Sequence, residues 1–207
     1  MSDFAINVAL GYLFGSIPFG LVVGFLFTGR DIRQFGSGKT GTTNVLRTAG
    51  RFAAILVMVG DISKGVVPAL VGRYFFDDNW VAAAGAAAGV VGHIFPIFAG
   101  FRGGRGVAVA FGGVLGLAPL WALALPLIGA AILIPTRYVS LMSVLGTAIA
   151  ALILCIAALL WDVPIAFAIY ALFATLIIEY MHIPNIKRLL AGTEPRLGQG
   201  GDRAATG

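Results

Sequence analysis

The sequence predicts an all-α, polytopic membrane protein, and three observations support this fold class. Of the 207 residues, 59% are hydrophobic and only 11% carry a charge. The mean hydropathy over the whole chain is +0.96. A soluble domain of this length has too little interior to bury so much apolar surface, so lipid must surround most of the chain.

Apolar segments of about 20 residues, the length that crosses the hydrocarbon core, follow one another from the N-terminus. The first carries Asp3 and lacks a basic beginning, so we expect a membrane span rather than a cleaved signal peptide. The run at 106–135 is too long for one span, and we expect it to divide at Pro119. The prediction is seven transmembrane helices, at about 4–28, 52–76, 80–99, two within 106–135, 138–160 and 164–183.

The distribution of charge predicts the orientation of these helices. All but Lys64 and Arg73 of the 14 lysines and arginines fall in alternate loops and the C-terminal tail, whereas the opposite loops hold Asp77, Asp78 and Asp162. Because basic loops stay in the cytoplasm, we expect the N-terminus outside and the C-terminus inside. We expect a single domain over 1–207, with about 184–207 as a cytoplasmic tail.

Composition also limits the partners and the covalent chemistry. The net charge of +5 is dispersed through short membrane loops, which favours anionic lipid and anionic substrates over nucleic acid. The 29 glycines are typical of closely packed transmembrane helices. The only cysteine, Cys155, lies in an apolar run, so no intramolecular disulfide can form.

The segment "GSGKT" at 36–40 looks like part of a nucleotide-binding P-loop. In that motif the first glycine would fall at position 33, which is Arg33, and polar residues instead of an apolar helix follow Thr40. We therefore expect no nucleotide there. Glycine backbone N–H groups, hydroxyls, Lys39 and Arg47 still suit a phosphate. A solvated basic loop is the alternative, and composition does not separate the two.

Two further segments fall on the same predicted face of the membrane. They are "GFRGGRG" at 100–106 and the segment that begins at Tyr180. Convergence of three basic segments, two of them rich in glycine, predicts a shared anion site.

Some ionisable residues have a structural and a functional interpretation. Asp61 and Lys64 are spaced to face each other on one helix, as a structural ion pair or as part of a site. His93 ends the third span, where histidine usually packs or forms hydrogen bonds. His182 and Asn185 either mark a helix end or form a hydrogen-bonding pair. No set of residues has metal-ligand spacing, so we expect no metal.

Five segments together resemble the bacterial acyl-phosphate:glycerol-3-phosphate acyltransferases. They are "GSIPFG" (15–20), "GSGKTGTTNVLRTAG" (36–50), "GDISKG" (60–65), "GHIFPIFAGFRGGRGVA" (92–108) and "NIKRLLAGTEPRL" (185–197). The resemblance implies a seven-helix enzyme of the bacterial inner membrane with its active site on the cytoplasmic side. It implies acyl transfer from acyl phosphate to the 1-hydroxyl of glycerol 3-phosphate. The products are lysophosphatidic acid and phosphate, the first step of phospholipid synthesis, with no cofactor and no nucleotide.

The resemblance also implies roles for individual residues. Catalytic groups are expected at Ser37, Arg47, Arg105, His182 and Asn185, and substrate-binding groups at Gly38, Lys39, Thr40, Gly41, Asn44, Gly103, Gly104, Ser140, Ser143 and Glu194. The sequence departs from the family in three places. Lys39 replaces the usual Asn, Arg105 replaces the usual Lys, and "HIPNI" replaces a more polar stretch.

A small anion transporter is the main alternative function. It requires polar residues that continue through the membrane to the outer face, but only Asp61 and Lys64 lie well inside a predicted span. A phosphatidyl-group transferase would need regularly spaced aspartates on one helix, which the sequence lacks. A non-catalytic scaffold leaves the three convergent basic segments unexplained.

Overall fold

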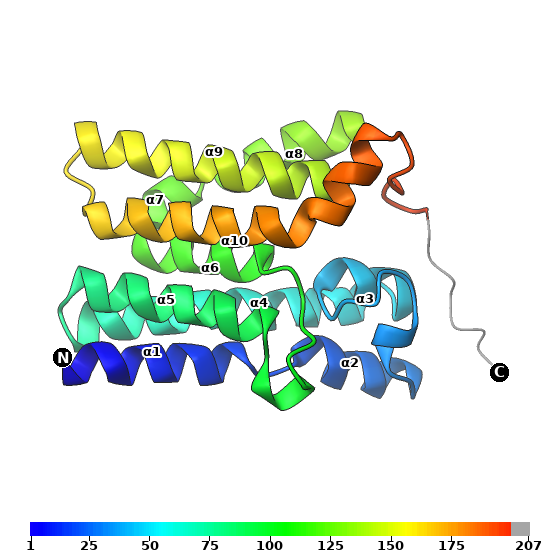
Figure 1. Ribbon diagram of the computed structural model, residues 1–207, viewed down its shortest axis with the longest axis horizontal. Helices are drawn as coiled ribbons and strands as arrows, with labels where there is room; N and C mark the ends of the chain where they lie inside the picture. Colours follow the sequence, from blue (N-terminus) through cyan, green and yellow to red (C-terminus); the bar gives the residue numbers. More distant parts are fainter. Residues whose placement is uncertain (200–207) are drawn as a thin grey trace.

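The structure is a computed structural model that describes residues 1–199, and these residues form helices and loops without a β-strand. Figure 1 shows the long helices side by side in an elongated bundle. Residues 200–207, which include Arg203 of the predicted tail, lie outside the described part. The elements are α1 (Ser2–Gly15), α2 (Phe19–Thr28), η1 (Ile32–Gln34), α3 (Thr42–Thr48), α4 (Arg51–Leu70), η2 (Val71–Phe75), α5 (Asn79–Ile94), η3 (Ile97–Ala99), α6 (Val107–Leu117), α7 (Pro119–Ala122), α8 (Leu125–Thr136), α9 (Val139–Leu160) and α10 (Ile165–Leu190).

The predicted all-α membrane class is confirmed. Six helical segments are long and apolar enough to cross a membrane. The predicted division at Pro119 is also present, because α6 ends at Leu117 and Pro119 begins α7. Proline suits the first turn of a helix, where its missing N–H costs nothing. With 11 residues, α6 is shorter than each of the six candidate membrane spans.

Two predicted spans differ from the observed helices. The first predicted span is interrupted between α1 and α2, where Pro18 precedes the second helix. The last does not end at 183, because α10 continues through Pro184 to Leu190. Residues 184–190 are therefore helical, and the non-helical segment begins after them.

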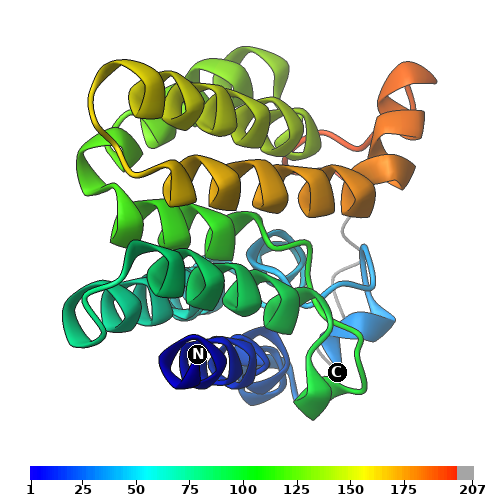
Figure 2. The same cartoon turned by 60° about the vertical axis from the view of Figure 1, so that its left-hand side comes forward.

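Glycines bring α1, α4, α5 and α6 into direct backbone contact. A Cβ on Gly15 of α1 would overlap the Gly89 backbone of α5, and one on Gly65 of α4 would overlap Val109 and Gly113 of α6. Lipid supplies no hydrophobic force between helices, so close packing of this kind holds them together. Figure 2 shows the resulting order, with α6 between α4–α5 and α10.

The second half of the bundle is packed less tightly. α10 packs on α5 and α6, α9 packs on α10, and α8 lies against α9. None of the α8 residues is buried. The space between α6 and α8 is therefore not closed by direct helix packing.

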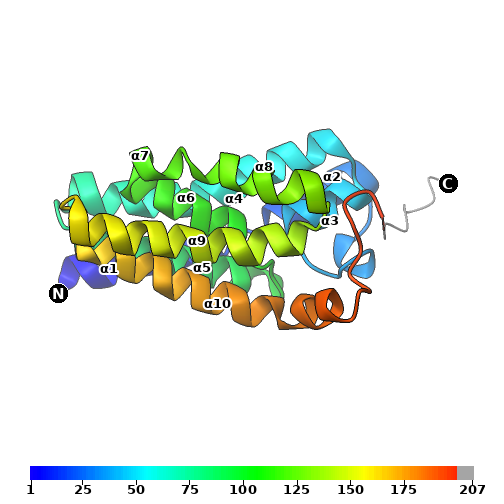
Figure 3. The same cartoon turned by 90° about the horizontal axis from the view of Figure 1, so that it is seen from above.

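A small apolar cluster attaches the segment between α2 and α4 to the bundle. Ile32 and Val45 pack on Ala53, Ala54 and Val57 of α4. In Figure 3, α3 and the end of α10 lie at the end of the bundle opposite the N-terminus. The basic segments predicted to share one face therefore do share one end of the structure.

The glycine contacts can be tested with a pair of Gly→Ala variants. Gly65→Ala should reduce the free energy of unfolding by about 1–3 kcal/mol, the usual cost of overpacking, because its Cβ would overlap Val109 O. Gly129→Ala on α8 is the control, since its Cβ would lie 3.5 Å from Met142 Sδ, an ordinary contact. Thermal unfolding in detergent measures both. Equal unfolding midpoints for the two variants would contradict the packing described.

Candidate functional site

A cavity of about 1360 Å³ runs from the basic end of the bundle into the space between α6, α8, α9 and α10. Its lining changes from polar to apolar along this path. At the basic end it is lined by loop residues, α3 and the end of α10. Deeper in, the apolar arm is lined by Val107, Phe111, Val114, Leu125, Leu133, Gly146, Ala150, Tyr170, Ala171 and Ala174.

Asn44 fixes the loop before α3. Its Oδ1 accepts a hydrogen bond from the Ser37 N–H at 2.9 Å, and its Nδ2 donates to the Ile32 carbonyl at 2.9 Å. The φ of Gly36 is 58°, a conformation that glycine adopts without strain. Since both ends of its amide are used within the chain, Asn44 holds the loop. Arg47, one turn further along α3, lines the cavity.

Arg105 follows two glycines that lie directly on the end of α5. The N–H groups of Gly103 and Gly104 donate to the carbonyls of Ile94 and His93, each at 3.2 Å. A Cβ on Gly104 would overlap Nε2 of His93. The glycine pair therefore allows a close approach that delivers Arg105 into the cavity.

Asp61, Lys64 and His93 form a buried cluster beneath this loop. The Lys64 Nζ lies 2.8 Å from Asp61 Oδ1 and 3.3 Å from His93 Nδ1, and each side chain is at most 5% exposed. Lys64 also lies 5.1 Å from the centroid of the Phe19 ring, where a cation is stabilised by the aromatic face. Asp61 and Lys64 thus form an ion pair that contacts the histidine touching Gly104, while Asp61 and His93 also line the cavity.

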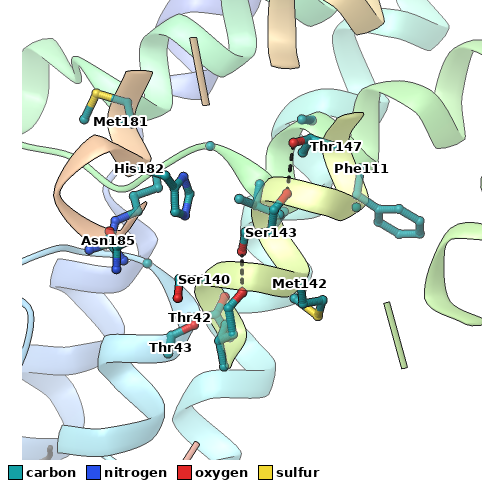
Figure 4. A pocket seen from close by; sticks show the side chains of 18 of the residues that line it. Thr42, Thr43, Phe111, Ser140, Met142, Ser143, Thr147, Met181, His182 and Asn185 are labelled. Carbon is teal, nitrogen blue, oxygen red and sulfur yellow. Dashed lines mark hydrogen bonds between the residues drawn. The ribbon is translucent and has the colours of Figure 1, made fainter. Parts of the chain in front are cut away.

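His182 lies within α10, and its Nδ1 is 2.8 Å from the Ile178 carbonyl. A carbonyl oxygen only accepts, so Nδ1 carries the hydrogen and Nε2 of the neutral ring is an acceptor. Figure 4 shows His182 and Asn185 facing Ser140 and Ser143 across the cavity. His182 therefore offers one acceptor nitrogen to whatever occupies this space.

The segment after α10 folds back through Glu194. Its carboxylate accepts from Asn185 Nδ2 at 2.7 Å and from Arg188 Nε at 2.7 Å. The carboxylate thereby orients one amide and one guanidinium that both line the cavity.

The two candidate serines on α9 differ in their hydrogen bonds. Ser143 Oγ donates to the Val139 carbonyl at 2.9 Å, inside its own helix. Ser140 Oγ is buried and forms no hydrogen bond of ordinary geometry within residues 1–199, although it lies near enough to the Glu194 carboxylate to help lower the pKa of that group. Ser140 is therefore the serine whose hydroxyl is available in the cavity.

Buried polar atoms without partners concentrate at this end of the cavity. An unsatisfied buried polar group costs about 1–3 kcal/mol, and most such groups are paired. Within the described chain, all of these atoms except Asn7 Oδ1 belong to cavity residues: Thr42 Oγ1, Arg47 Nε, Arg105 Nε, Ser140 Oγ and Asn185 Oδ1. Guanidinium donors beside hydroxyl and amide groups match an anion that also carries hydroxyls.

Positive charges crowd together here. Burial lowers the pKa of the Lys39 ammonium, and the charge of Arg105 lowers it further. Burial also lowers the pKa of Arg105, while Glu194 opposes this and Arg188 and Arg47 add to it. Burial alone would raise the pKa of Glu194, but the hydrogen bond from Asn185, the nearby Ser140 hydroxyl and the hydrogen bond and charge of Arg188 leave it lowered. One ionised carboxylate thus faces several cations, and a bound anion would relieve their repulsion.

Most of the predicted site residues come together around this cavity. Its lining includes Ser37, Lys39, Gly41, Asn44, Arg47, Arg105, Ser140, Ser143, His182, Asn185 and Glu194. Gly38, Thr40, Gly103 and Gly104 lie outside the lining and shape the backbone behind it. Sequence reasoning placed Arg188 only in a basic tail. Its spacing of three residues from Asn185 puts both on one helix face, which is the signal that could have found it.

No group of three or more His, Cys, Asp or Glu side chains in residues 1–199 is arranged to hold a metal ion.

Comparison with known sequences gives consistent matches. The sequence model of the family described as glycerol-3-phosphate acyltransferase matches residues 5–192. A protein of that name from Rubrobacter xylanophilus is 40% identical over 191 residues, covering 92% of this chain and 94% of the relative. Another, "Glycerol-3-phosphate acyltransferase 3" from Dehalococcoides mccartyi, is 43% identical over 208 residues and covers 93% and 94%.

Solved structures give the same result. The crystal structure of PlsY (YgiH), described as an integral membrane glycerol 3-phosphate acyltransferase in its glycerol 3-phosphate form, superposes with a TM-score of 0.87 at 41% identity. Its lysophosphatidic acid form gives a TM-score of 0.85 at 39% identity. Both comparisons cover 93% of this chain and 94% of the solved one.

The buried cluster predicts a specific response to loss of one charge. Lys64→Met keeps an unbranched side chain but leaves Asp61 without its cation, and we expect the free energy of unfolding to fall by about 3–5 kcal/mol. The double variant Asp61→Asn/Lys64→Met removes both charges and should recover part of the loss. Unfolding in detergent measures all three proteins. Full stability of the single variant would show that the two charges are not coupled.

Proposed function

This chain belongs to the glycerol-3-phosphate acyltransferase family, and we propose that it transfers a fatty acyl group from acyl phosphate to the 1-hydroxyl of glycerol 3-phosphate. The products are lysophosphatidic acid and phosphate. The observation that carries this proposal is a single cavity with a basic, hydroxyl-rich end and an apolar arm. The basic end suits two phosphate groups, and the apolar arm suits an acyl chain. The two ligand forms described for the solved relative support both assignments.

The proposed reaction needs positioning more than it needs activation of a nucleophile. Acyl phosphate is a mixed anhydride with a good leaving group, but its partner is also an anion. Arg47 and Arg105 offset the repulsion and hold the reacting atoms together, and Lys39 only adds positive charge beside them. The 1-hydroxyl oxygen bonds to the acyl carbon, and the carbon–oxygen bond to phosphate breaks with its electron pair. The hydroxyl proton passes to the departing phosphate.

The polar residues of α9 and α10 fit the glycerol part of the acceptor. Ser140 Oγ and Asn185 Oδ1 are buried and without partners in the described chain. His182 Nε2 is an acceptor because Nδ1 donates to Ile178. In our proposal these groups take the hydroxyls of glycerol 3-phosphate, while the guanidinium groups take its phosphate.

We further propose seven membrane crossings, with α6 as the short one and the catalytic end of the bundle in the cytoplasm of a bacterial inner membrane. The gathering of the basic segments at one end supports this orientation. The alternative function, an anion transporter, requires a polar path to the other end. The described cavity instead continues as an apolar arm between helices.

The donor is tested directly with purified protein and glycerol 3-phosphate. We expect lysophosphatidic acid from acyl phosphate and none above background from acyl-CoA, whose thioester lacks a phosphate at the reacting carbonyl for Arg47 and Arg105 to hold. Activity should persist in EDTA, because the cations assigned to the phosphates belong to the chain. Efficient use of acyl-CoA, or complete loss in EDTA reversed by a divalent ion, would argue against the proposal.

Two cations between α2 and α4, Lys39 in the loop and Arg47 in α3, should differ in importance. Arg47→Ala should lower the initial rate by about two to three orders of magnitude, because a charged hydrogen bond lost from a transition state costs roughly 2–4 kcal/mol. Arg47→Lys should recover only part of the rate, since a point charge does not replace the guanidinium fork.

Lys39→Asn is the matched comparison, and its rate should stay within about tenfold of the parent. This substitution restores the asparagine that the family usually has at position 39. The proposed acyl transfer should therefore not require a cation at this position. Gel filtration in detergent checks that each variant is folded. A benign Arg47→Ala together with an inactive Lys39→Asn would show that the phosphate is wrongly placed.

A further inference from the structure

Gly146 of α9 differs from every other α-helical glycine in the described chain. A Cβ at Gly113 would overlap the Tyr170 ring, and one at Gly112 would overlap the Ile62 carbonyl. At Gly146 the added Cβ would meet no atom of the described residues within 4 Å. Close packing therefore explains the other α-helical glycines except Gly129, which makes only an ordinary contact and also lines the cavity, but it does not explain Gly146.

Backbone conformation does not explain Gly146 either. Its φ is not among the positive values, and it lies well inside α9. Glycine in the middle of a helix is unfavourable relative to alanine, because it loses more freedom on folding. The feature that remains is the free space itself, which belongs to the cavity that Gly146 lines.

The position of Gly146 along the cavity can be measured on α9. Ser140, Ser143, Gly146, Thr147 and Ala150 line the cavity from one face of this helix. At a rise of about 1.5 Å per residue, Gly146 lies roughly 9 Å beyond Ser140, and Ala150 lies roughly 15 Å beyond it. Gly146 is thus partway along the apolar arm.

The arm is closed beyond Ala150. The deepest lining residues of the neighbouring helices are Val114 and Tyr170, and the Tyr170 hydroxyl donates to the Ala110 carbonyl at 3.0 Å. Past this level the helices pack together through Leu117, Leu154 and Phe167, which are at most 2% exposed. The apolar arm of the cavity therefore ends near the level of Val114, Ala150 and Tyr170.

We propose that the space at Gly146 lets an acyl chain extend past Gly146 along α9. Residue 146 would then determine which acyl-chain lengths the enzyme accepts. This inference rests on the proposed function, in which the arm holds the acyl chain of the donor. A larger side chain at 146 would close the arm roughly 9 Å beyond Ser140. A short acyl chain would still fit, and a long one would not.

The test is a competition between palmitoyl phosphate and octanoyl phosphate, whose chain is half as long, at equal concentrations with saturating glycerol 3-phosphate. Mass spectrometry gives the ratio of the two lysophosphatidic acids, and this ratio does not depend on how much of the protein is active. Gly146→Leu should shift the ratio toward the octanoyl product by about tenfold or more, the usual effect of a few methylenes that no longer fit. Gly146→Ala should give a smaller shift in the same direction.

Ala148→Leu is the matched control, because Ala148 lies on the exposed side of the same turn of α9. It should leave the ratio unchanged. An unchanged ratio in Gly146→Leu, or an equal loss with both donors, would overturn the inference while leaving the acyl-phosphate reaction in place. If the parent protein used neither donor, the proposed function would fail and the inference with it.

Discussion

Direct backbone contact between α4 and α6 is the constraint on which the rest of the structure depends. Gly65 on one helix and Gly112 and Gly113 on the other leave no room for a Cβ. Gly113 faces α10 instead, where it makes room for the Tyr170 ring, whose hydroxyl donates to the Ala110 carbonyl. α10 is thereby fixed on α6. Because α6 is drawn toward α4, the space on its other side, toward α8, remains for the cavity.

This contact also links the packing to the charges at the site. Lys64 immediately precedes Gly65 and Asp61 lies one turn earlier, and both reach His93 at the end of α5. The glycine pair before Arg105 rests on that histidine. The charges of the cluster are satisfied inside the chain, whereas Arg105 has a buried Nε without a partner in the described residues. Helix packing therefore decides which cations are structural and which face the cavity.

Much of the fold could be predicted from the sequence, because lipid imposes the length of each apolar run and Pro119 cannot continue a preceding helix. The clustering of the basic segments at one end could also be predicted, since unpaired charge is costly in hydrocarbon and basic loops gather on one side of a membrane. The functions of single residues depend on partners distant in the chain. Nothing in the sequence around Asn44 shows that its amide is taken up by Ser37 and Ile32. Gly113 and Gly146 both occur in apolar helices, yet the Tyr170 ring fills the space beside Gly113, whereas the space beside Gly146 is open.

The shortness of α6 has a consequence for how deep in the bilayer the chemistry takes place. α6 runs in the same direction as α4, and its Val109 lies against Gly65. Arg105 therefore enters near the level of Asp61, roughly 15 Å along α4 from Arg51 by helical rise. Phe52 and Ile55, at the start of α4, are 66% and 52% exposed and have the apolar surface that lipid requires. Arg105 thus lies at a level of the bundle where the outer surface of α4 is already apolar. In the proposed reaction, an acyl donor in the membrane would therefore stay in its leaflet, and the water-soluble acceptor would be the partner that enters.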